Sequence, residues 1–100
     1  MRFDPWDPFA EIQILRLMNR DAVLFHLGEA KGELDRTITR IANDPDYDIG
    51  EFLVAMSHLY NHLNTAWNGR NASAERHTEC SQTDFDNWRK FPPNEELLLD

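Results

Sequence analysis

Apolar residues recur along most of this chain at the three-to-four-residue spacing of a helix, and no stretch alternates in the manner of a strand. The pattern predicts helices over about 8–20, 22–43, 49–68 and 83–90. Residues 70–82 show no period and are predicted to form a loop, and residues 92–100 are expected to form a tail. We therefore expect one all-α domain over 1–100, an antiparallel helical bundle of three main helices plus a short C-terminal helix.

The first two helices cannot be one straight rod. A continuous helix from residue 9 to 42 would be about 50 Å long, which exceeds the size of a compact domain of this length. Asn19-Arg20-Asp21 offers the best internal cap, because an Asn side chain accepts from the free amides of the next turn. A bend at Gly28 and Gly32 is the alternative, since each glycine weakens a helix by about 1 kcal/mol.

Capping residues also mark the ends of the later helices. Asp48 with Glu51 three residues on is the pattern of a capping box, and it starts the third helix. Gly69 is expected to end that helix. Thr83 with Asp86 is expected to cap the last helix, which Pro92-Pro93 would stop. The short connection before Asp48 predicts that the second and third helices form an antiparallel hairpin.

The apolar residues of the second and third helices form narrow stripes, which are expected to face the core. The stripe of the second helix holds Leu27, Ala30, Leu34, Ile38 and Ile41. The stripe of the third helix is centred on Met56. Apolar residues of the first helix spread around most of its circumference, which favours burial of the surplus in a homodimer. The candidate interface residues are Phe9, Ile14, Leu17, Gly28, Gly32, Leu97, Leu98 and Leu99.

Composition and charge narrow the possible partners. The chain is 41% hydrophobic, and its ten Lys and Arg against eighteen Asp and Glu give a net charge of -8. Such an acidic protein repels phosphate backbones, so nucleic acid and anionic membranes are poor partners. No apolar run is long enough to cross a bilayer, and the first residues lack a signal-peptide pattern. With one cysteine, the sequence predicts a cytoplasmic protein.

A cluster of nitrogen and sulfur ligands is the main candidate for chemistry. His58 and His62 lie one turn apart on the third helix, and His77 and Cys80 follow within the predicted loop. These four side chains match the tetrahedral preference of zinc, if the loop folds back. Against this, His58 and His62 fall about 120° to 160° from Met56, which predicts that they point away from the core. His26, between Phe25 and Leu27, is interpreted as an interface histidine.

Two functions therefore remain open. The leading one is a small acidic helical module without evident catalysis, which acts through protein contact and self-associates. The alternative is a zinc protein built on His58, His62, His77 and Cys80, which becomes a metal-dependent hydrolase if a base such as Glu75 or Glu79 serves it. A Cys80 nucleophile next to His77 has no rigid third partner in the sequence, and an ordinary loop thiol explains it as well.

Overall fold

The computed structural model describes residues 18–97, and this part of the chain contains five helices and no strand. Two helices are long, α2 (Arg20–Asn43) and α3 (Ile49–Asn68). Three are short, α4 (Ala74–Glu79), α5 (Gln82–Trp88) and α6 (Asn94–Leu97). The all-α prediction is confirmed. The helix expected over 8–20 lies, up to residue 17, outside the described residues.

Helix α2 begins where the internal cap predicts. The Asn19 side chain accepts a hydrogen bond of 3.0 Å from the Ala22 amide, and its own backbone is extended. Its side-chain amide also donates to the Ala72 carbonyl at 3.0 Å, which ties the start of α2 to the segment that follows α3. Helix α2 is one continuous helix through Gly28 and Gly32, so the predicted break is at Asn19.

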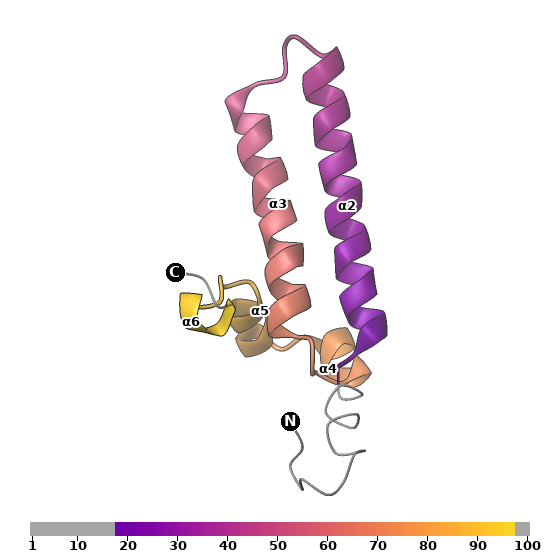
Figure 1. The fold of residues 1–100 in the computed structure, drawn as a ribbon, viewed down its shortest axis with the longest axis vertical. Helices are drawn as coiled ribbons and strands as arrows, with labels where there is room; N and C mark the ends of the chain where they lie inside the picture. Colours follow the sequence, from indigo (N-terminus) through magenta and orange to yellow (C-terminus); the bar gives the residue numbers. More distant parts are fainter. Residues whose placement is uncertain (1–17, 98–100) are drawn as a thin grey trace, which may run out of the picture.

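The ends of α3 also follow the sequence signals. Asp48 accepts from the Glu51 amide at 2.8 Å, and the Glu51 carboxylate accepts from the Asp48 amide at 3.1 Å, which completes the capping box. Gly69 is the C-terminal cap, and its amide donates to the Thr65 carbonyl at 2.8 Å. Helices α2 and α3 lie side by side and run in opposite directions, joined by a short turn (Figure 1).

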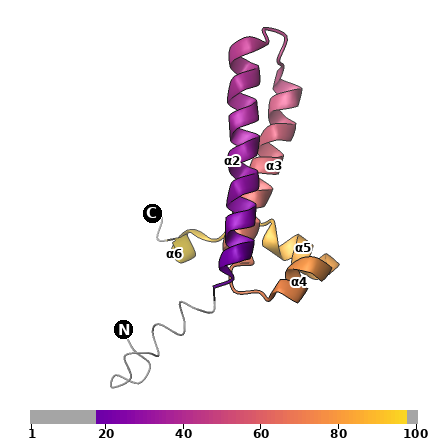
Figure 2. The ribbon, with the colours of Figure 1, turned by 90° about the vertical axis from the view of Figure 1, so that its right-hand side faces the viewer.

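The short helices gather at the open end of this hairpin. Helices α4 and α5 lie on one side of it and α6 on the other (Figure 2). Helix α5 packs against α3, and its Trp88 is buried. The described residues therefore form a two-helix hairpin with a cluster of short helices at its base, and they do not show the expected bundle of three main helices.

Two predictions for the C-terminal third are wrong. Helix α4 lies inside the predicted loop 70–82, and α5 is capped by Ser81, which accepts from the Asp84 amide at 3.1 Å. Thr83 lies within α5 and not at its cap. Six or seven residues span fewer than two turns, which is too short for an apolar period to show in the sequence. The tail 92–100 likewise contains the single turn of α6.

The contact between α2 and α3 is made by small and polar side chains. Its buried residues include Ala30 and Thr37 of α2 and Ala55 of α3. Three side-chain pairs join the two helices: His26 with His62, Glu33 with His58, and Arg40 with Glu51. The surface of α3 that bears His58 and His62 therefore faces α2. His62 thus faces α2, against the expectation that both histidines point away from the core, whereas His58 stays largely exposed. The helices are rotated so that most large apolar residues of the stripes lie beside the contact, while Ala30 lies in it.

Candidate functional site

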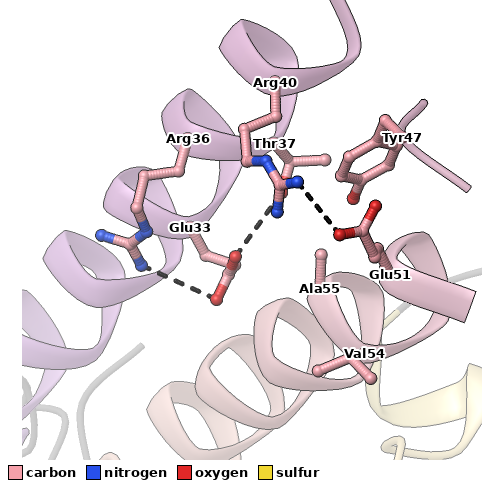
Figure 3. A pocket seen from close by; sticks show the side chains of 8 residues that line it. All are labelled: Glu33, Arg36, Thr37, Arg40, Tyr47, Glu51, Val54 and Ala55. Carbon is pink, nitrogen blue, oxygen red and sulfur yellow. Dashed lines mark hydrogen bonds and ion pairs between the residues drawn. The ribbon is translucent and has the colours of Figure 1, made fainter. Parts of the chain in front are cut away.

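The described residues hold two candidate pockets, one near the turn of the hairpin and one near its base. The first has a volume of about 340 Å³ and is lined by charged side chains of α2 and α3 (Figure 3). Arg40 donates to the Glu51 carboxylate at 3.0 Å and to the Asp44 carboxylate at 3.2 Å, and these bonds raise the pKa of Arg40. Arg36 lies 3.6 Å from Glu33. The charges of this pocket are paired with one another, and they hold the two helices together near the turn.

The second pocket gathers the chain's metal-type ligands and is called the histidine pocket here. It has a volume of about 290 Å³ and lies where α2, α3, α4 and α5 meet. The chain has four histidines and one cysteine, and all five line this pocket. They are His26, His58, His62, His77 and Cys80. The four residues of the zinc hypothesis thus share one pocket, and the structure adds His26 to them.

His26 and His62 are in direct contact. Their Nδ1 atoms lie 3.2 Å apart, so one ring donates its N–H to the other ring's nitrogen. Their ring centroids are 5.4 Å apart, and the centroid of His77 lies 5.9 Å from that of His26. Burial lowers the pKa of His26 below its ordinary 6.5, and the nearby His62 and His77 lower it further, against a smaller opposing effect of Glu29. The neutral form of His26 is therefore favoured in the fold.

His77 is held in place by the end of α3. Its Nε2 atom donates to the Gly69 carbonyl at 2.8 Å, which leaves Nδ1 with its lone pair. Its ring also stacks on Trp88 with a centroid distance of 4.7 Å. Gly69 makes room for this ring, because a Cβ atom there would lie 2.9 Å from Cε1 of His77. The orientation of His77 thus depends on the C-terminal cap of α3.

His58 and Cys80 complete the set. His58 Nδ1 is 3.3 Å from the Glu33 carboxylate, and 59% of its side chain is exposed. Cys80 ends α4 in a left-handed conformation with φ 38°, which costs about 1–2 kcal/mol for a residue other than glycine. Its thiol is free and half-buried. As the side chains stand, residues 18–97 contain no group of three or more His, Cys, Asp or Glu residues arranged to hold a metal ion.

Sequence reasoning missed His26 as a partner of His62. A single histidine between two apolar residues gives no spacing signal, and its place in the pocket follows only from the rotation of α2 against α3. The pairing of His62 with His26 also shows that a histidine outside the apolar stripe of a helix can lie in a helix contact.

A third feature is an exposed layer of large apolar side chains, called the apolar face here. At 100° per residue, the stripe of each long helix lies about 90° to 130° from the residues that contact the other helix. Viewed from the N-terminus of each helix, the apolar stripe is rotated in the same direction away from the contact. Because the two helices are antiparallel, both stripes therefore lie on the same side of the hairpin. The face comprises nine exposed residues: Leu24, Leu27, Leu34, Ile38, Ile41, Ile49, Phe52, Tyr60 and Leu63.

Three of the residues predicted as an interface are described by the structure, and none of them belongs to the apolar face. Gly28 and Gly32 lie on α2, outside the apolar face; a Cβ at Gly28 would meet no atom within 4 Å, and one at Gly32 would lie 3.2 Å from the Arg36 guanidinium. Leu97 lies in α6 and is 37% exposed. The other five lie outside the described residues: Phe9, Ile14, Leu17, Leu98 and Leu99.

Comparisons with known proteins add no relative. No protein-family model, curated protein or solved structure matches the chain. Among residues 18–97, no helix combines the length and the apolar character that a bilayer crossing requires.

Proposed function

We propose that this chain is a cytoplasmic helical module that acts through protein contact, and that its apolar face binds the same face of a second copy. One observation carries the proposal. The buried residues of the contact between α2 and α3 are small or polar, whereas nine large apolar side chains of these helices are exposed. An exposed apolar patch of this extent is typical of an interaction site.

The size of the apolar face suits a dimer. Its nine side chains range from 36% exposed at Phe52 to 80% at Ile49. At roughly 90 Å² of exposed surface each, they offer on the order of 800 Å², which is the area per partner of a standard interface. Smaller surfaces are common in weak encounters, so this area favours a stable complex.

The shape of the face favours a second copy as the partner. Each chain supplies a layer of two antiparallel helices with one apolar side, and two such layers facing one another complete a four-helix arrangement. A two-fold axis then matches each stripe with its equivalent, as in most homodimers. Gly28 and Gly32 lie outside this contact, so the proposal rests on the apolar stripes and not on the glycines.

A matched pair of substitutions tests the proposal. Ile38 lies on the apolar face and Val54 on the other side of the hairpin, and these β-branched residues are 57% and 55% exposed. Sedimentation velocity of the full chain is expected to show a dimer for the parent and for Val54→Glu. Ile38→Glu is expected to be a monomer of unchanged helicity, because it places a charge in the centre of the interface.

Two results would overturn the proposal. One is a parent chain that sediments as a monomer at every concentration, which would mean that the apolar face binds another partner or another part of the chain. The other is equal weakening of the dimer by both substitutions, which would place the contact elsewhere.

A further inference from the structure

We propose that the histidine pocket binds one zinc ion, with His26, His62 and His77 as nitrogen ligands and Cys80 as the sulfur ligand. This site is separate from the apolar face, since it lies where α2 and α3 meet α4 and α5. The inference does not depend on the proposed dimer. It replaces His58 of the sequence hypothesis with His26.

The gathering of the ligands is the first argument. The four histidines and the one cysteine of the chain are spread over residues 26–80. Helices α2, α3 and α4 bring all five to one pocket, with Cys80 at the end of α4. Packing alone gives no reason for every imidazole and the single thiol to share a pocket, since histidine and cysteine differ in size and polarity. Imidazole nitrogen and thiolate sulfur are the ligands that zinc prefers.

The distances are the second argument. Two imidazole nitrogens on a tetrahedral zinc ion, each about 2.05 Å from the metal, lie about 3.3 Å apart, and the ring centroids then lie about 5.2 Å apart. The Nδ1 atoms of His26 and His62 are 3.2 Å apart, with centroids at 5.4 Å. The centroids of His26 and His77 are 5.9 Å apart. The His26–His62 pair therefore already has the spacing of two zinc ligands, and the spacing of His26 and His77 exceeds it by about 0.7 Å.

Support from neighbouring groups is the third argument. Histidines that bind zinc usually donate their other N–H to a carbonyl or carboxylate, which fixes the ring and its tautomer. His77 already donates from Nε2 to the Gly69 carbonyl, which leaves Nδ1 as the donor atom for a metal. His58 donates instead to Glu33 and is 59% exposed, so it is assigned to the rim of the pocket and not to the ion.

Binding requires a defined exchange of protons. One of the two rings now donates its Nδ1 proton to the other ring. To bind the ion, the donor ring must lose this proton to water and take up another at Nε2, so that both Nδ1 atoms carry a lone pair. The two Nδ1 lone pairs then turn from one another toward the ion. Cys80 loses its thiol proton and binds as the thiolate, so one proton is released for each ion bound.

Cobalt(II) is a suitable probe because its absorption reports both geometry and ligand type. The full-length chain, prepared without bound metal, is titrated with Co²⁺ and then with Zn²⁺. We expect one equivalent of Co²⁺ to give the strong visible bands of a tetrahedral site and a thiolate-to-cobalt charge-transfer band, and Zn²⁺ to displace it. His26→Gln is expected to weaken binding at least tenfold, by analogy with the loss of supporting groups in zinc sites.

The other variants separate the ligands from the pocket. Cys80→Ser is expected to abolish the charge-transfer band. Asn61→Ala, which alters a pocket residue without removing a proposed ligand, is expected to bind like the parent. Circular dichroism of each apo variant shows whether it remains folded. If His26→Gln does not fold, His58→Gln still separates the proposed ligand set from the one that the sequence predicts, because it is expected to bind like the parent.

Several outcomes would overturn the inference. They are absence of stoichiometric binding by the parent, a six-coordinate cobalt spectrum without a thiolate band, and binding that survives His26→Gln and Cys80→Ser. Binding lost in His58→Gln and retained in His26→Gln would also overturn it, in favour of the ligand set that the sequence predicts.

Discussion

Replacement of Gly69 by alanine tests the packing that holds α3 against α4 and α5. Gly69 is buried at the C-terminal cap of α3 with φ -97°, a conformation that alanine adopts readily. The added Cβ would lie 2.9 Å from Cε1 of His77, 3.0 Å from the Thr65 carbonyl oxygen and 3.3 Å from the Trp88 ring. Since the Thr65 oxygen belongs to the helix backbone, turning the His77 side chain does not relieve every close contact.

The magnitude follows from three contributions. Overpacking of this kind costs about 1–3 kcal/mol, and displacement of His77 loses its hydrogen bond to Gly69, worth about 1 kcal/mol. The reduced freedom of the unfolded chain returns about 0.4–1 kcal/mol. We expect Gly69→Ala to lower the free energy of unfolding by about 1–3 kcal/mol.

Gly28→Ala is the matched control. Gly28 lies inside α2, where an added Cβ meets no atom within 4 Å. Alanine there is expected to raise the free energy of unfolding by about 0.5–1 kcal/mol, because it restricts the unfolded chain and favours the helix. Urea unfolding followed by circular dichroism, at one fixed chain concentration, measures both changes. A Gly69→Ala midpoint equal to or above that of the parent would refute the described packing around His77.

Three further results are expected. Because the pKa of His26 is lowered in the fold, the unfolded chain binds more protons than the folded chain just below pH 6.5. The free energy of unfolding should therefore fall as the pH drops from 6.5 toward the folded pKa of His26. Thermal melts of His26→Gln should show a smaller fall. Asp48→Ala should cost about 0.5–2 kcal/mol in urea unfolding and Asp48→Asn less, since Asn keeps the capping acceptor; equal losses would contradict the capping box. The Arg76 guanidinium holds the pKa of Asp84 below its ordinary 3.8, so an NMR titration of Arg76→Gln should show a higher Asp84 pKa than the parent; equal values would exclude the ion pair in solution.

Local signals predicted the ends of the long helices. The Asn19 cap, the Asp48 and Glu51 capping box and the Gly69 terminus each depend on hydrogen bonds between near neighbours in the chain, so their sequence patterns carry the information. The same principle explains the missed cap of α5. Ser81 is followed three residues on by Asp84, as Thr83 is by Asp86, so the same local pattern fits both positions and does not choose between them.

The rotation of each long helix about its axis was not predictable from the sequence. An apolar stripe shows which side of a helix avoids water, but the stripe is equally well covered by the same chain or by another. The sequence suggested that Leu34 and Ile38 face α3 together with Ala30, whereas the structure buries Ala30, leaves Leu34 and Ile38 exposed and places Thr37 in the contact. The partnership of His26 with His62 depends on this rotation, so it was outside the reach of pattern analysis.

Multi-angle light scattering of the unmodified chain, in a buffer with chelator, shows whether two copies associate in solution. The chelator removes any association through metal ions, so only the apolar face contributes. The proposal expects a mass of twice the 11.7 kDa of one chain at micromolar concentrations. A mass of 11.7 kDa that persists to high micromolar concentrations would contradict the claim that the apolar face binds a second copy.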